Sequence, residues 1–158
     1  MCVLVKCWMK RGQQKRIATP GQQKWHHLIG AYNWCTGEVI YTLCAKKNAD
    51  AFCDFLEHLM NTVTSGKPIV YVLDNASYHH SQQSEAMIAY YEAHAWAYWL
   101  PPYCSDLNLI ERFWKHMKAK ACANRLFEDI SEVVDSVVNV LIAQNDFASS
   151  ERFLFQAT

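Results

Sequence analysis

The chain has 158 residues, of which 51% are hydrophobic, and equal numbers of basic and acidic residues give a formal net charge of zero. This composition predicts one compact globule and excludes a disordered tail. No apolar run approaches the roughly 20 residues needed to cross a bilayer, and the N-terminus lacks a secretory signal, so a soluble intracellular protein without a membrane partner is expected.

The charges are distributed unevenly along the chain. Six cations precede the first acid, Glu38, whereas the remaining chain has nine basic and fifteen acidic residues. Such a basic arm, residues 1–24, suits a phosphate backbone, although an ordinary solvated loop accounts for it equally well. The candidate contacts in the arm are Lys10, Arg11, Lys15 and Arg16. The seven cysteines and seven histidines lack the spacing of a disulfide framework or a zinc site.

The first predicted elements are a β-hairpin and a helix. Residues 25–34 and 38–44 are rich in Tyr, Ile, Val and Thr, and the Cys-Thr-Gly sequence between them predicts a turn near Gly37. Asn48 is placed to cap a helix whose apolar residues recur at helical spacing. These apolar residues are Phe52, Phe55, Leu56, Leu59, Met60 and Val63. One face of this helix should therefore lie in the core.

The next elements alternate between strands and helices. The apolar run IVYVL at 69–73 predicts a strand that helices bury on both faces. The elements predicted after it are helix 82–94, strand 95–100 (AWAYWL), helix 109–121 and helix 128–144. The order hairpin, helix, strand, helix, strand, helix, helix predicts an α/β fold, with a mixed sheet flanked by helices.

Two acids occupy positions that such a sheet brings together. Asp74 directly follows the IVYVL strand, and Glu111 opens the helix after the next strand. The 36 residues between them leave room for one helix, one strand and a loop, so both acids should lie at the same edge of the sheet. There they could hold Mg²⁺, while Arg112, Lys115 and Lys118 contact phosphate. A turn-forming aspartate and a surface Glu111–Lys115 ion pair explain the same residues.

Two long segments resemble a known family. VLDNASYHHS at 72–81 and LPPYCSDLNLIERFWKHMK at 100–118 closely resemble signatures of the DDE-type transposases of the mariner-like insertion-sequence superfamily. The hairpin is also similar, so the resemblance covers about residues 8–125. It implies a ribonuclease H-like fold and a DDE endonuclease. Such an enzyme would use three carboxylates with Mg²⁺ or Mn²⁺ to nick transposon ends and join them to target DNA.

The resemblance also implies a role for each matching residue. Asp74 corresponds to the second acid of the triad and Glu111 to the third, so both are expected to be catalytic and to bind the metal. The residues expected to support them are Asn75, Asn108 and Arg112. His79 and His80 should line the site, because a hard cation prefers oxygen ligands.

The chain departs from the family pattern in its first acid. Residues 1–37 contain neither Asp nor Glu, and the strand that ends in this acid is the central strand of the family's sheet. We therefore expect a single, partial catalytic domain in which that central strand is missing or replaced. Its parts would be a basic loop arm (1–24), a core (25–125) and a C-terminal helix with a tail (126–158).

These observations favour a truncated transposase whose DNA cleavage and strand transfer are impaired in isolation. Its expected partners are transposon-end and target DNA, a second copy of the chain or a full-length transposase, and its expected location is the bacterial cytoplasm, at the nucleoid. An alternative hypothesis is a non-catalytic DNA-binding regulator of a full-length transposase. A resolvase or integrase of the same fold is a further alternative.

Overall fold

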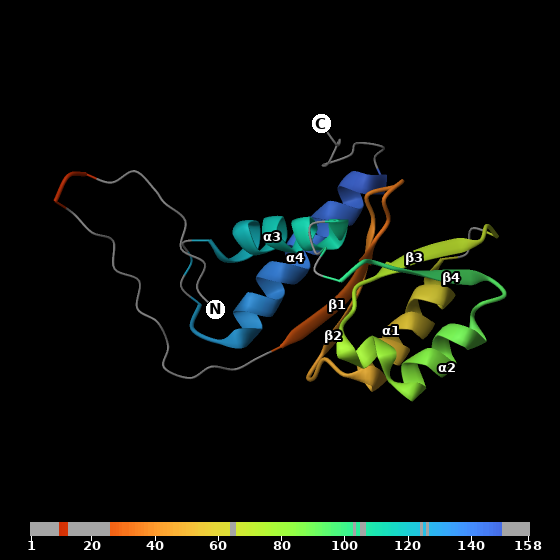
Figure 1. The fold of residues 1–158 in the computed structure, drawn as a ribbon. Coiled ribbons are helices and arrows are strands. Elements are labelled where there is room, and N and C mark those ends of the chain that lie inside the picture. The colour runs from red at the N-terminus through yellow and green to blue at the C-terminus, as the bar shows by residue number, and fades with distance from the viewer. Residues whose placement is uncertain are drawn as a thin grey trace.

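The computed structural model describes residues 10–12, 26–63, 66–102, 104, 107–123, 125 and 127–149. The elements follow the chain as β1, β2, α1, β3, α2, β4, α3 and α4 (Figure 1). Most of the predicted basic arm, including Lys15 and Arg16, lies outside the described residues. The part of the chain that is described contains no helix both long and apolar enough to cross a bilayer.

The predicted hairpin is confirmed. Strand β1 (His27–Tyr32) pairs antiparallel with β2 (Val39–Cys44). The turn between them uses the side-chain oxygen of Asn33, which accepts a hydrogen bond from the main-chain N of Cys35 at 2.9 Å. Gly37 has a φ of 78°, a left-handed conformation that glycine adopts without steric cost. The turn chemistry thus explains why the chain reverses here.

The predicted capped helix is also confirmed. Helix α1 (Ala49–Thr62) begins after Asn48, whose side-chain oxygen accepts from the main-chain N of Ala51 at 3.1 Å. This bond satisfies one of the amide donors left free at the helix start. The buried side chains of α1 are Phe52, Cys53, Phe55, Leu56 and Leu59.

Strands β3 (Ile69–Leu73) and β4 (Ala95–Trp99) form a parallel pair, as expected for strands joined by a helical crossover. The crossover contains a 3₁₀ turn (Ser77–His80) and α2 (Gln82–Tyr90), which ends four residues before the predicted helix end. Residues 91–94 form a turn instead. The crossover therefore returns the chain to a strand that starts level with β3.

The prediction that helices bury β3 on both faces is wrong. Val70 and Val72 are 60% and 48% exposed, and Trp96 and Tyr98 on β4 are 56% and 61% exposed. The opposite face is covered, and Tyr71 there is only 8% exposed. Among the described elements, α1 and α2 pack on that face, whereas α3 and α4 pack on the hairpin (Figure 1). One face of the β3–β4 pair is therefore open.

Helices α3 (Leu109–Cys122) and α4 (Ile130–Ser149) cover the hairpin. They form a core cluster with β2. Its buried residues are Val39, Phe113, Met117 and Leu141. Gly30 allows the close approach of α3, because a Cβ atom at that position would lie 2.9 Å from Cη2 of Trp114. Helix α4 starts two residues after, and ends five residues after, the predicted bounds.

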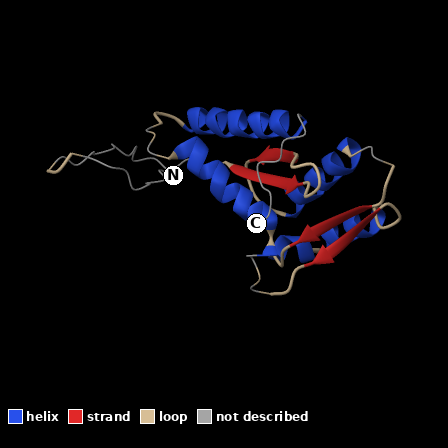
Figure 2. Ribbon diagram, turned by 90° about the horizontal axis from the view of Figure 1, so that it is seen from above, coloured by secondary structure: helices blue, strands red, loops and turns tan. Residues whose placement is uncertain are grey.

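The described strands belong to two separate two-stranded sheets, β1–β2 and β3–β4. Figure 2 shows the two pairs of arrows apart, with helices beside each. Both pairs contribute to one core cluster around α1, in which Ile29 of β1 and Tyr71 of β3 pack with Phe52. No described strand hydrogen-bonds to both pairs. Within the described residues, the two pairs are therefore connected through α1 and not through strand pairing.

Candidate active site

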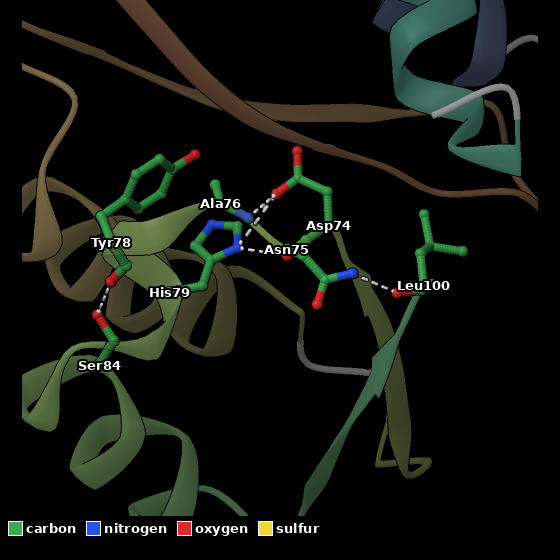
Figure 3. Close-up of polar contacts among 7 residues, drawn as sticks. All are labelled: Asp74, Asn75, Ala76, Tyr78, His79, Ser84 and Leu100. Carbon is green, nitrogen blue, oxygen red and sulfur yellow. Dashed lines mark hydrogen bonds and ion pairs between the residues drawn. The ribbon is translucent and has the colours of Figure 1, made fainter. Parts of the chain in front are cut away.

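Asp74 stands at the carboxyl edge of the β3–β4 pair. It follows the last residue of β3, and the main-chain N of Leu100 donates to the oxygen of Leu73 at 2.9 Å. The side-chain amide of Asn75 donates to the main-chain oxygen of Leu100 (Figure 3). These two bonds continue the hydrogen bonding between the two chain segments just beyond the ends of β3 and β4. Asn75, expected to support the metal ligands, thus ties the two strand ends together beside Asp74.

The carboxylate of Asp74 is held through one of its two oxygens. Oδ1 accepts from the main-chain N of Ala76 at 3.2 Å and lies 3.3 Å from Nδ1 of His79. The other oxygen points away from the side chains drawn in Figure 3. The side chain is 43% exposed, so this oxygen remains accessible to an external ligand.

His79 packs beneath Asp74. It is only 7% exposed, and burial lowers the pKa of its imidazole, although the hydrogen bond and the charge of Asp74 act in the opposite direction. Nδ1 lies 3.1 Å from the main-chain oxygen of Asp74 in addition to its contact with Oδ1. Both oxygens are hydrogen-bond acceptors, so the two contacts are hydrogen bonds when Nδ1 carries a proton.

Two serines stabilise the turn that carries His79 through hydrogen bonds. Ser84 is fully buried, and its hydroxyl donates to the main-chain oxygen of Tyr78 at 2.6 Å. The hydroxyl of Ser81 in turn donates to Ser84 at 2.9 Å. Hydrogen bonds within the segment from Asp74 to Ser84 therefore help to fix its conformation, which gives a physical reason for its polar sequence.

Two side chains near Asp74, those of Lys47 and Tyr78, were missed by reasoning from the sequence, whereas His80 was expected to line the site. Lys47, in the loop before α1, lies with its Nζ 5.4 Å from the centre of the Tyr78 ring. Lys47 lowers the pKa of Tyr78, although burial has the larger effect and raises it. No motif or helical spacing links residues so far apart in the chain. His80 stacks on Trp99 at 4.4 Å, which places it near the end of β4.

Glu111 lies in the first turn of α3 and is exposed to solvent. Its main-chain N donates to the main-chain oxygen of Asn108 at 3.0 Å, and Asn108 stands at the N-cap position without a side-chain capping bond. In Figure 1, the end at which α3 begins is the end nearer to β3 and β4. The convergence of Glu111 with Asp74 on one metal ion remains a prediction.

The predicted phosphate contacts fall into two groups. Arg112, Lys115 and Lys118 are exposed on α3, and Lys10 and Arg11 are exposed in the short described segment near the N-terminus. The exposed side chains of Arg112, Lys115 and Lys118 are thus accessible to a large partner. Among the described residues, no three His, Cys, Asp or Glu side chains gather to form a metal site. The roles of Asp74 and Glu111 as two acids of the expected triad rest on their positions in the sequence and stay predictions.

Comparison with known sequences identifies relatives over most of the chain. The model of the family described as DDE superfamily endonuclease matches residues 3–134. The insertion element IS630 uncharacterized 39 kDa protein of Shigella sonnei is 26% identical over 147 residues, which cover 93% of this chain and 43% of that protein. The uncharacterized protein y4pE/y4sA of Sinorhizobium fredii (strain NBRC 101917 / NGR234) is 24% identical over 110 residues, covering 70% and 78%. The chain thus spans less than half of the IS630 protein.

Two solved structures share the fold. The crystal structure of the Mos1 strand transfer complex aligns with a TM-score of 0.56 and 16% identity, over 96% of this chain and 50% of that chain. The simian T-cell lymphotropic virus intasome in complex with PP2A regulatory subunit B56 gamma aligns with a TM-score of 0.51 and 16% identity, over 84% and 52%. The predicted ribonuclease H-like α/β fold is confirmed. The chain belongs to the DDE superfamily endonuclease family.

Proposed function

We propose that this chain is the catalytic part of a DNA transposase that cleaves transposon ends and joins them to target DNA with Mg²⁺ or Mn²⁺. The observation that carries the proposal is the carboxylate of Asp74, which stands at the carboxyl edge of a parallel strand pair with one oxygen engaged and one exposed. Ligands of open α/β sheets bind at this edge. Membership of the DDE endonuclease family supports this placement of the chemistry.

The groups available at this edge suit a hard divalent cation. The free oxygen of Asp74 and the exposed carboxylate of Glu111 are the oxygen ligands that Mg²⁺ and Mn²⁺ prefer. When bound, such an ion would supply Lewis-acid stabilisation of charge on the phosphate under attack. Arg112, Lys115 and Lys118 would hold the DNA backbone beside it by charge-assisted hydrogen bonds. Asn75 would keep the ends of β3 and β4 in register.

The remaining acid of the proposed site, the first of the triad, must come from outside residues 1–37, which contain no Asp or Glu. We therefore expect residues 1–158 to bind DNA but to perform strand transfer poorly without a polypeptide that supplies this acid. The partners in this proposal are transposon-end and target DNA, together with a second copy or a longer transposase chain. In a bacterium, such a protein would work at the nucleoid.

An oligonucleotide cleavage assay tests this function. We expect residues 1–158 alone to give no strand transfer in Mg²⁺, because one metal-binding acid is absent. A chimera that joins the chain to the N-terminal part of the IS630 protein of Shigella sonnei should nick labelled transposon-end DNA, and Asp74→Asn should abolish this activity. Robust Mg²⁺-dependent strand transfer by residues 1–158 alone would contradict the incomplete site. A chimera that cleaves equally well with Asp74→Asn would contradict the assigned acid.

The exposed cations of α3 favour a second candidate, a DNA-binding regulator that interferes with a complete transposase. Simultaneous Asp74→Ala and Glu111→Ala substitutions separate the two functions. A regulator keeps its salt-dependent DNA affinity and its inhibitory effect after these changes, since neither depends on metal. For the transposase, the same substitutions in the chimera should abolish cleavage.

A further inference from the structure

His79 contacts Asp74 at two points with different consequences. The contact of Nδ1 with the main-chain oxygen, at 3.1 Å, orients the backbone where the chain leaves β3. The contact with Oδ1, at 3.3 Å, restricts rotation of the carboxylate. The main-chain N of Ala76 acts on the same oxygen at 3.2 Å. Together these contacts occupy Oδ1 and leave Oδ2 as the oxygen for an external ligand.

The imidazole of His79 is itself held in place. Its ring centre lies 4.5 Å from that of Phe52 on α1 and 4.3 Å from that of Tyr78, against which it packs edge to face. Ser84 binds the main-chain oxygen of Tyr78, so the turn beneath the ring is anchored to α2. A side chain that is 7% exposed and packed on two aromatic rings has little freedom to turn its Nδ1 away from Asp74.

We propose that His79 is a positioning residue for the metal-binding carboxylate: its Nδ1–H fixes Asp74 so that Oδ2 faces the cation. This inference rests on the proposed function, because it assumes that Asp74 binds a divalent metal. Groups that hydrogen-bond to metal ligands typically change metal affinity by about 10–100-fold when they are replaced. The effect arises because a carboxylate already held in its binding orientation loses less conformational entropy when the ion arrives.

Two amide substitutions separate the hydrogen bond from the packing. His79→Asn places an amide N–H near the position of Nδ1, whereas His79→Gln is one methylene longer and places the same group near Nε2. We expect His79→Gln to weaken Mn²⁺ binding to the full chain by about tenfold or more and His79→Asn to keep most of the wild-type affinity. The affinity is measured from the paramagnetic resonance signal of free Mn²⁺, with urea unfolding as a check on each variant.

The outcomes distinguish this inference from the function on which it rests. Loss of Mn²⁺ affinity in Asp74→Asn combined with wild-type affinity in His79→Gln would overturn the role of His79 alone. Wild-type affinity in Asp74→Asn would overturn the metal site itself. A further measurement uses the wild-type protein and so does not depend on how the variants fold. The ¹⁵N chemical shifts of the His79 ring should report the Nδ1–H tautomer. An Nε2–H tautomer would contradict the inference.

Discussion

At the scale of single residues, Gly30 sets how closely α3 approaches the hairpin. A Cβ atom there would lie 2.9 Å from Cη2 of Trp114 and 3.0 Å from the main-chain oxygen of Ile40. The oxygen belongs to the backbone of β2 and cannot move aside easily. We therefore expect Gly30→Ala to lower the free energy of unfolding by about 1–3 kcal/mol, as overpacking does in other cores. Urea denaturation measures this change.

Trp114→Phe provides the control for this prediction. A smaller ring removes the indole atoms from the crowded space but leaves the oxygen of Ile40 in place. Gly30→Ala should then cost less in the Trp114→Phe background than in the wild type. An equal cost in both backgrounds would show that the indole is not what limits the approach of α3.

His116 makes the stability of the protein depend on pH. Burial on α3, with a smaller effect of Lys120, lowers its pKa from the ordinary value of 6.5. The unfolded chain therefore binds protons at a higher pH than the folded chain does. Stability should fall as the pH drops below about 6.5, and the loss should stop once the pH is below the folded-state pKa. The burial of His79 lowers its pKa and acts in the same direction.

Urea unfolding at pH 7 and at pH 5.5 measures this dependence. We expect His116→Gln to lose less unfolding free energy between the two pH values than the wild type does, because one of the groups whose pKa is lowered in the folded protein is gone. Equal losses in the two proteins would contradict a lowered pKa for His116.

Residue roles could be predicted from the sequence only where a motif carries them. The positions of Asp74 after a strand and of Glu111 at a helix start indicated which acids to examine, and the resemblance supplied their expected roles. The contact between His79 and Asp74 was not predictable, because residues five apart meet here through a 3₁₀ turn and not through a regular helix. Lys47 was missed because its neighbour Tyr78 is distant in the chain.

At the scale of elements, α4 closes the outer edge of β2. The side-chain amide of Asn145 accepts from the main-chain N of Val39 at 2.8 Å and donates to its oxygen at 3.0 Å, as a neighbouring strand would. Gln144 beside it donates to the oxygen of Gly37 at 2.8 Å. Without these bonds, the main-chain groups would be buried without hydrogen-bond partners. The bonds also fix the position of α4 along β2.

Asn145→Ala should therefore destabilise the protein. Val39 is 1% exposed, so its two main-chain groups would lose their partner in a buried setting, at a cost of about 1–3 kcal/mol. Asn139→Ala is the matched control, because Asn139 is exposed on the same helix and should change stability by about 0.5 kcal/mol or less. Thermal or urea unfolding compares the two variants, and similar effects would contradict the edge contact.

The presence of each helix or strand was easier to predict than which of its faces would be buried. Hydrophobic spacing identified the hairpin, α1 and both parallel strands, because it depends on local periodicity. The same spacing could not show that one face of β3 is open. A run such as IVYVL is apolar at every position, so it does not reveal which of its sides a helix covers. In β4 the small alanines face the core, and the large Trp96 and Tyr98 face outwards.

At the scale of the whole molecule, α1 joins two strand pairs that share no hydrogen bonds among the described residues. Length, composition and local patterns predicted the α/β class, whereas the specific fold depended on the resemblance of two segments. Long-range pairing between strands is not encoded in local periodicity. The chain spans 43% of the IS630 protein, so the complete enzyme in our proposal includes polypeptide beyond residues 1–158.

The central claim is that Asp74 and Glu111 share one divalent cation. The most direct measurement is a titration of ¹⁵N-labelled protein with Mn²⁺, followed by the paramagnetic broadening of individual amide signals. We predict that the signals of Asp74 and Glu111 broaden together at the same Mn²⁺ concentration and that Asp74→Asn removes the broadening at Glu111. Broadening at one residue without the other, or broadening at Glu111 that survives Asp74→Asn, would contradict the shared site.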